Sequence, residues 1–447
     1  MGRAGIERHG AVAALGVEPG GKLDYAHRVK LFHAADIHLD SPLRGLDRYE
    51  GAPAERLRGA TRAALGNLVD ACIDEGVDGL LVAGDLFDGA WKDYSTGLFF
   101  VTAMGRLKAA GIPVVVVRGN HDAESIVARK LPALDHVRVL SSRKPESVEL
   151  AGGAIVVHGM SFGSKAVSDD IASRYPDARP GVINVGLLHT SLDGREGHEP
   201  YAPTSLDVLR SKGYAYWALG HVHAREIVSR DPWVVFPGNL QGRHARETGD
   251  KGATLITFSA SGVASVEHRS LDVVRWARVE VDATGASSVD DVLERARAAI
   301  AEAAEAAEGL LVAARVTVVG ATEASGALHA DAELAGKVRL VAADAAGADA
   351  WVEKVEVRTR TSIDLEALRK QDSALGQLAR RLAETRDDDA ALAELTSCFS
   401  DVAKKLPADV RAGADGFDPT DPATMRELYT YVEETLLGAL TGGAEEP

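Results

Sequence analysis

Five short motifs place metal-competent side chains directly after apolar stretches of the chain. In order they are D-x-H, GDLFD, GNHD, the histidine that closes VGLLH, and GHVH. They supply two carboxylates, one amide oxygen and four imidazoles, from Asp36, His38, Asp85, Asn120, His189, His221 and His223. Oxygen and nitrogen ligands without thiolate suit divalent cations such as Mn²⁺, Fe²⁺, Zn²⁺ or Mg²⁺. A single motif of this kind is weak evidence, but packing alone gives no reason to place seven such residues at successive strand ends.

The motifs predict two cations rather than one. Asp85 follows a glycine at a strand end, where its carboxylate can bridge two ions about 3.5–4 Å apart. We expect Gly84 and Gly119 to form tight turns with positive φ. Two such ions can catalyse phosphoester hydrolysis, because they activate water and neutralise the charge of the phosphoryl oxygens. The remaining ligands would divide into Asp36, His38 and His223 on one ion and Asn120, His189 and His221 on the other.

His121 and Asp122 are predicted to be catalytic rather than metal-binding. His121 adjoins the ligand Asn120 and can face a phosphate, where its imidazolium would stabilise charge or protonate the leaving oxygen. Asp122 could orient that ring, as carboxylates beside metal centres commonly do. The alternative is that His121 is a spare ligand or a surface residue.

The elements that must position these residues follow an α/β pattern. From residue 29, β-branched runs alternate with amphipathic stretches at 56–75 and 93–110, a β-α-β-α-β signature. Six further apolar runs follow with short spacers, from GAIVVHGM to VASVEHRS. We expect two sheets packed face to face between helices, an αββα sandwich over residues 29–270. Strand C-termini carry the polar residues, where α/β folds build their sites.

The remaining segments predict smaller units. Residues 271–363 show strand, helix, strand, helix and strand, which indicates a small α+β domain. Residues 364–447 are helical in period, and these helices either pack on their own domain or bind a partner helix. Residues 1–28 lack the pattern of a secretory signal, and we interpret them as a disordered extension or an overlong start.

Composition restricts the class of protein. The net charge is −16, but residues 271–447 carry 19 Lys and Arg against 34 Asp and Glu, so the acidity belongs to the C-terminal part and does not exclude a polyphosphate substrate. Two cysteines far apart suggest neither a disulfide framework nor a thiolate metal site, which favours a reducing cytoplasm. No apolar run is long enough to predict a membrane span.

The ordered motifs resemble the calcineurin-like metallophosphoesterase superfamily across about residues 29–270. AADIHLDSPL, VAGDLFD, RGNHD and LGHVHAREI are similar to bacterial DNA repair exonucleases of the SbcD and YhaO type, and FPGNLQGRHARETGDKG to the YhaO subgroup. GDLFD and GNHD differ from the GDxxDRG and GNHE of protein serine/threonine phosphatases, which argues against a phosphoprotein substrate. Where break-repair nucleases often carry GDLFH, this sequence has Asp88, which puts a second histidine contact there in doubt.

The resemblance implies a manganese-dependent DNA nuclease whose second domain is a capping domain that helps to place DNA over the metals. It also implies a coiled-coil ATPase partner of the SbcC type, which would contact helices after residue 364, and a homodimer. Arg243, His244 and Arg246 would be phosphate or DNA contacts; the alternative is a solvated basic turn.

Two other functions stay open at this point. One is a small-molecule phosphodiesterase or nucleotide phosphatase, which would have little use for a capping domain. The other is a non-catalytic metal-binding scaffold that recruits the ATPase to DNA. Such a scaffold would have no use for a leaving-group acid at His121.

Overall fold

The computed structural model describes residues 28–41, 53–88, 94–125, 133–192, 201–362, 364–406 and 417–442. The extension predicted for residues 1–28 lies outside the described residues, apart from its last residue. Within the described stretches, no helix combines the length and the apolar character needed to cross a membrane.

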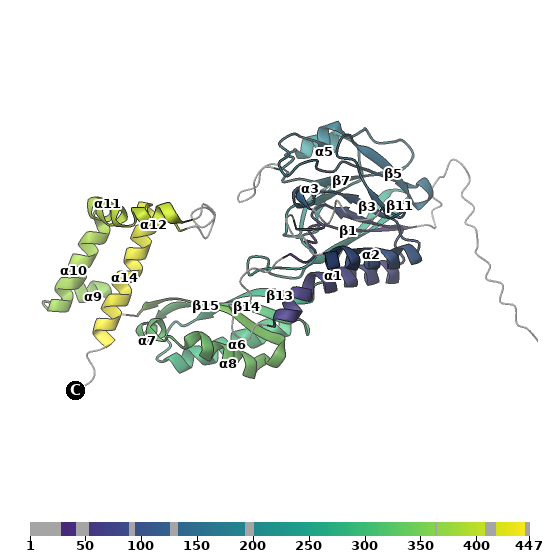
Figure 1. The fold of residues 1–447 in the computed structure, drawn as a ribbon. Helices are drawn as coiled ribbons and strands as arrows, with labels where there is room; N and C mark the ends of the chain where they lie inside the picture. Colours follow the sequence, from purple (N-terminus) through teal and green to yellow (C-terminus); the bar gives the residue numbers. More distant parts are fainter. Residues whose placement is uncertain are drawn as a thin grey trace, which may run out of the picture.

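Two six-stranded mixed sheets form the larger part of the fold (Figure 1). The first sheet has the order β12 (Gly262–Ser270), β11 (Gly252–Ser259), β1 (Val29–Ala34), β2 (Gly79–Ala83), β3 (Val114–Val117), β4 (Val137–Val139). The second has the order β5 (Glu146–Leu150), β6 (Ile155–Gly159), β7 (Ile183–His189), β8 (Tyr216–Gly220), β10 (Trp233–Phe236), β9 (Glu226–Arg230). β1 to β4 of the first sheet run parallel, with β4 at the edge, and so do β6, β7, β8 and β10 of the second sheet.

The central strands are short apolar runs that are buried on both faces. β2 reads GLLVA and β3 reads VVVV, and every residue of both is buried. Such runs, without alternation, are typical of parallel strands that are covered on both sides. Leu31, Leu81 and Val115 of the first sheet share one core with Val157 and Leu187 of the second. The two sheets therefore pack face to face.

Helices cover the outer faces of both sheets. α1 (Ala54–Asp74) and α2 (Tyr94–Ala109) pack on the first sheet. The second sheet is covered by shorter elements, including η3 (Ala172–Arg174) and α5 (Leu206–Ser211). The predicted αββα sandwich is confirmed. Two other short elements of this part are α3 (Asn120–Glu124) and η2 (Ala151–Gly153).

A third sheet follows, made of three parallel strands: β13 (Val274–Asp282), β14 (Leu311–Thr322) and β15 (Ala350–Thr361). Helices α6 (Val289–Ala306) and α8 (Leu334–Ala346) pack on one face of it, with α7 (Ser325–Ala330) and η4 (Gly347–Asp349) between the strands in sequence (Figure 1). On the other face, the end of the sheet where the three strands begin packs on the sandwich: Trp276, Ala313 and Trp351 share one apolar cluster with Leu57 of α1 and Ala245. This contact seats the small domain beside the loops of the larger one.

The last helices form a bundle with a small apolar core. Its buried residues are Leu368, Ala379 and Leu437. A fully buried carboxylate, Glu433, receives hydrogen bonds from Arg369 and Arg386 at 2.8 and 3.2 Å. The predicted C-terminal helices are therefore present, and polar contacts hold much of the bundle together. They are α9 (Leu365–Arg369), α10 (Ala374–Asp387), α11 (Asp389–Cys398), α12 (Ser400–Lys405) and α14 (Pro422–Gly442).

Candidate metal centre

The seven predicted ligands all lie at the carboxyl ends of parallel strands. The first motif follows β1, GDLFD follows β2 and GNHD follows β3, and these three strands are neighbours in the first sheet. His189 is the last residue of β7, and GHVH follows its neighbour β8 in the second sheet. Because both sheets present these ends at the same side of the sandwich, residues far apart in sequence meet there.

The backbone at these positions is strained. Asp36, His38, Asp40, Asp85 and His221 adopt positive φ angles of 51°, 45°, 56°, 51° and 108°. Side chains other than glycine rarely adopt this conformation, and it persists where the surroundings enforce it. Asp40 helps to enforce it, because its carboxylate accepts hydrogen bonds from Arg62 of α1 and Thr96 of α2. Such strain concentrates at functional sites.

One group of ligand atoms comes from the first and last motifs. His38 Nε2 lies 3.3 Å from His223 Nε2, and His223 Nε2 lies 3.8 Å from Asp36 Oδ1. Asp36 uses its other oxygen, Oδ2, to accept the His221 backbone N–H at 2.9 Å. In the described part of the chain, the buried Oδ1 has no hydrogen-bond donor. An acceptor of this kind fits a cation.

A second group lies beside it. His189 Nδ1 donates to the Ala83 carbonyl at 2.9 Å, so Nε2 carries the lone pair. That Nε2 faces Asn120 Oδ1 at 3.0 Å and Asp85 Oδ2 at 3.5 Å. Burial lowers the pKa of His189 to about 3, so the ring is neutral. Three hydrogen-bond acceptors, His189 Nε2, Asn120 Oδ1 and Asp85 Oδ2, therefore face one another without a donor between them. A divalent cation bound by all three would satisfy them.

Asp85 and His221 complete the arrangement. Asp85 Oδ2 lies 4.0 Å from His38 Nε2 as well as 3.5 Å from His189 Nε2, so it stands between the two groups. Its Oδ1 is held by the backbone N–H of His121 at 3.0 Å. The His221 ring lies next to that of His189, with 5.3 Å between the ring centroids.

The buried carboxylates of Asp36 and Asp85 have the charge and the surroundings of cation ligands. Burial raises the pKa of Asp36 to about 7 and that of Asp85 to about 6. Both side chains are almost wholly excluded from solvent. Two buried anions this close together are costly unless positive charge accompanies them. The residues present thus suit a pair of divalent cations in both donor type and charge.

The ring of His121 is oriented by Asp88, which corrects the role expected for Asp122. His121 Nδ1 donates to Asp88 Oδ1 at 2.7 Å. This hydrogen bond raises the pKa of His121 and lowers that of Asp88 to about 2. Asp122 instead accepts the backbone N–H groups of Leu86, Phe87 and Gly119 at 3.2, 2.9 and 3.1 Å. Its carboxylate therefore fastens two ligand-bearing loops together and does not contact the imidazole.

Glu247 is a functional residue that the sequence did not reveal. It is 6% exposed, and its Oε1 accepts the Nδ1–H of His223 at 2.6 Å. Burial alone would raise the pKa of Glu247, but the hydrogen bond from His223 and the charge of Arg243 outweigh it and hold the pKa well below its usual range. The carboxylate fixes the tautomer of His223 and turns its Nε2 towards Asp36, as partners of metal-binding histidines do.

The three residues expected to contact DNA occupy different surroundings. The Arg243 side chain is 15% exposed and lies inside, with Nη2 3.3 Å from Glu247 Oε1 and Nη1 3.4 Å from the Ser41 hydroxyl. His244 and Arg246 lie on the surface. Arg243 reaches the ligand cluster, with Nη2 3.4 Å from His223 Nδ1, and its charge lowers the pKa of Asp88.

Gly84 and Gly119 are needed for different reasons. Gly84 has a φ of +93°, as expected. Gly119 has a φ of −90°, so the expectation of positive φ is wrong there. A Cβ at Gly119 would lie 2.8 Å from His189 Nε2 and closer still to Asp85 Oδ1. Glycine is required because the two ligands occupy the space of a side chain.

Gly119→Ala is expected to weaken Mn²⁺ binding by about 10- to 100-fold, because it pushes Asp85 and His189 apart. The matched control is Gly105→Ala in α2, where a Cβ meets nothing within 4 Å. That change should leave Mn²⁺ affinity unaltered and stabilise the helix by about 0.5–1 kcal/mol. Calorimetric Mn²⁺ titration of both variants checks this, and equal affinities would contradict the steric account.

Two family models match the chain. Residues 29–225 match the calcineurin-like phosphoesterase model. Residues 29–225 are a calcineurin-like phosphoesterase domain. Residues 276–360, which form the third sheet and its helices, match the middle domain of the metallophosphoesterase YhaO. Calcineurin-like phosphoesterases use a dinuclear metal site, and the ligand cluster of this phosphoesterase domain has the donors for one.

Several known proteins are similar to the chain. The uncharacterized metallophosphoesterase YhaO of Bacillus subtilis (strain 168) is 37% identical over 261 residues, 58% of this chain and 64% of that protein. The DNA double-strand break repair protein Mre11 of Sulfurisphaera tokodaii is 28% identical over 265 residues, 55% of this chain and 64% of that protein. These matches support a metallophosphoesterase of the YhaO and Mre11 type, and the chain spans slightly less than two thirds of the length of these relatives. The crystal structure of TT1561 of Thermus thermophilus matches at 16% identity and a TM-score of 0.34, covering 55% of this chain and all of that one.

Proposed function

We propose that this phosphoesterase hydrolyses phosphodiester bonds in DNA with two divalent cations, most readily Mn²⁺, and that it acts in DNA repair. The observation that carries the proposal is the convergence of acceptor atoms around Asp85 Oδ2, next to an imidazole that a carboxylate holds in position. The similarity to proteins named for double-strand break repair supports DNA as the substrate.

The ligand cluster would divide between two ions. When bound, the cations would supply Lewis acidity for the phosphoryl oxygens and acidify a water molecule. Oxygen and imidazole donors suit Mn²⁺, and Fe²⁺, Zn²⁺ and Mg²⁺ are alternatives. Asp85 would touch both ions, with Asp36, His38 and His223 completing one, and Asn120, His189 and His221 the other.

The chain's own residues perform the remaining steps. His121 is 39% exposed at its side chain, so a phosphodiester can reach it. Asp88 holds one ring nitrogen and favours the charged ring, so the other nitrogen can donate a proton to the leaving oxygen. Arg243 adds positive charge beside the cluster for a non-bridging oxygen. The dyad of His121 and Asp88 argues against a scaffold without catalytic activity.

The other parts of the chain would serve the DNA and the partners. Residues 29–270 would be the nuclease domain and residues 271–363 the capping domain. Residues 364–447 would dock a coiled-coil ATPase of the SbcC type in the cytoplasm, and the chain would act as a homodimer. Support for docking comes from α14, where Val432, Leu436 and Leu440 are 48, 39 and 47% exposed at intervals of four residues. An apolar stripe of that spacing fits a partner helix.

The test is incubation of the purified full chain with Mn²⁺ and three substrates: end-labelled linear duplex DNA, end-labelled single-stranded DNA, and bis-p-nitrophenyl phosphate. We expect metal-dependent degradation of DNA as well as hydrolysis of the small diester. Asp344→Asn, at a carboxylate 70% exposed on α8, should behave like the wild type.

Hydrolysis of the small diester with DNA left intact, even after an ATPase partner is added, would favour the small-molecule phosphodiesterase. Inertness towards all three substrates in the presence of Mn²⁺ would contradict the proposed function and favour the scaffold.

A further inference from the structure

Loop 239–247, which lies between β10 and β11, contacts both the small domain of β13 to β15 and the metal centre. Its buried polar residues Asn239, Gln241 and Glu247 are 0, 1 and 6% exposed. Buried polar side chains are retained where their hydrogen bonds fix a conformation. The partners of these three therefore indicate what the loop holds in place.

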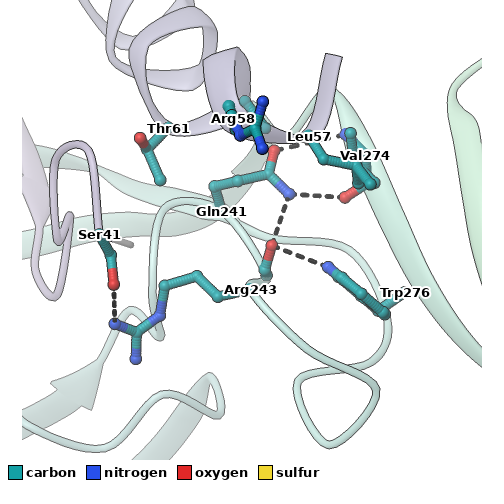
Figure 2. Close-up of a pocket in the computed structure, with 10 residues that line it drawn as sticks. Ser41, Leu57, Arg58, Thr61, Gln241, Arg243, Val274 and Trp276 are labelled. Atoms are coloured by element: carbon teal, nitrogen blue, oxygen red, sulfur yellow. Dashed lines mark hydrogen bonds between the residues drawn. The ribbon is translucent and has the colours of Figure 1, made fainter. Parts of the chain in front are cut away.

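At one end, the loop binds strand β13 of the small domain. Gln241 Nε2 donates to the Val274 carbonyl at 2.6 Å, and Gln241 Oε1 accepts the backbone N–H of Val273 at 2.9 Å and of Val274 at 3.3 Å. The side-chain amide thus pairs with the start of β13 as another strand would. Trp276 Nε1 donates to the Gly242 carbonyl at 3.0 Å (Figure 2). Both contacts fix the loop against the small domain.

At the other end, the loop holds the metal ligand His223 through Glu247. Glu247 Oε2 accepts the Arg243 backbone N–H at 2.7 Å and the Asn239 Nδ2–H at 3.0 Å. Asn239 Nδ2 also donates to the Gln241 carbonyl at 2.8 Å. The side-chain amide of Asn239 therefore links Gln241, which binds β13, to Glu247, which orients His223.

We propose that Glu247 is a positioning residue for one metal ion only, and that its hold on His223 depends on how strand β13 is seated against loop 239–247. The proposal rests on the metal centre proposed above. A shift of β13 pulls on Gln241 and Gly242, and through Asn239 and Arg243 it changes the direction of the Glu247 carboxylate. The lone pair of His223 Nε2 then turns away from Asp36 and His38.

Two of the ligands proposed for the second ion, His189 and Asn120, are held by contacts outside this loop. His189 is fixed by the Ala83 carbonyl of β2, and Asn120 begins helix α3, whose preceding glycine is held by Asp122. Within the described residues, the hydrogen bonds of these two ligands lead to β2 and to each other rather than to loop 239–247. Seating of the small domain would thus control the occupancy of the first site while the second stays filled. A capping domain that meets a DNA end or a partner could act on the chemistry by this route.

The test uses the full chain with Gln241→Leu and Trp276→Phe, and it measures Mn²⁺ binding by titration calorimetry and by electron paramagnetic resonance. Neither residue belongs to the ligand cluster. For Gln241→Leu we expect one ion to bind about 10- to 100-fold more weakly and the other to bind as in the wild type. Trp276→Phe removes one hydrogen bond and keeps an aromatic ring, so about a 3- to 10-fold loss at the same ion is expected.

Two further variants calibrate the result. Glu247→Gln should reproduce the loss at one ion, because the amide no longer provides a carboxylate for His223 Nδ1–H. Arg297→Ala removes an exposed ion pair between α6 and α8 of the same small domain, away from the loop, and should bind both ions normally.

Wild-type affinity for both ions in Gln241→Leu and Trp276→Phe would overturn the inference, as would an equal loss at both ions in a folded variant. If circular dichroism shows that Gln241→Leu is unfolded, Trp276→Phe alone decides, and wild-type binding by it overturns the inference. A wild-type chain that binds no Mn²⁺ would instead contradict the proposed function. Binding is measured without substrate, so the two failures are distinguishable.

Discussion

Asp85→Asn is expected to abolish phosphodiester hydrolysis while stabilising the metal-free protein. Asp85 stands between the two ligand groups, and it is buried beside Asp36. Loss of a ligand shared by both ions removes several kcal/mol of transition-state stabilisation, which corresponds to a rate lower by about 1,000-fold or more. In the metal-free protein the same change removes a buried negative charge whose pKa is raised to about 6. The free energy of unfolding should rise by about 1–3 kcal/mol.

Thermal unfolding with and without Mn²⁺ measures both the stability of the metal-free protein and the stabilisation by the metal. Mn²⁺ at 100 times its dissociation constant should stabilise the wild type by about 2.7 kcal/mol for each bound ion, and Asp85→Asn by much less. Asp344→Asn should match the wild type in both conditions. A variant that keeps its activity, or that Mn²⁺ stabilises as strongly as the wild type, would contradict the role given to Asp85.

His121→Ala is expected to damage cleavage of DNA far more than hydrolysis of bis-p-nitrophenyl phosphate. The leaving group in DNA is an alkoxide that needs a proton, and a positioned general acid contributes about 100- to 10,000-fold to such a step. p-Nitrophenolate is a stable anion and leaves without a proton. We therefore expect a loss of about 100-fold or more with DNA and of less than about 10-fold with the small diester.

Asp88→Asn should show the same substrate dependence with a smaller loss, since the imidazole remains but its Nδ1–H no longer meets a carboxylate. The ratio of kcat/KM for the two substrates is the measurement. An equal loss with both substrates would show that His121 serves the metals or the fold rather than the leaving group.

The sandwich, and the meeting of the seven candidate ligands, could be predicted because each candidate stands at the end of an apolar strand or just after it. β1, β2, β3, β7 and β8 are buried runs whose ends must meet once the two sheets pack face to face. The order of the strands then determines which polar residues meet.

The supporting residues could not be predicted, because their partners come from other loops. Asp122 is adjacent to His121 in sequence, which predicts the wrong partner, because neighbouring residues on a helix point in different directions. Asp88 reaches the ring from the loop after β2. Glu247 lies in a loop without periodicity, and only the fold brings it 2.6 Å from His223 Nδ1. The space constraint at Gly119 likewise depends on two side chains from other strands.

The most direct measurement of the central claim is a titration of Mn²⁺ into the metal-free wild-type chain, followed by electron paramagnetic resonance. Two ions per chain, with the spectrum of a magnetically coupled pair at saturation, are the predicted result, because Asp85 Oδ2 lies 4.0 and 3.5 Å from ligand nitrogens of the two groups. A single ion, two ions without coupling, or no binding would contradict the dinuclear centre.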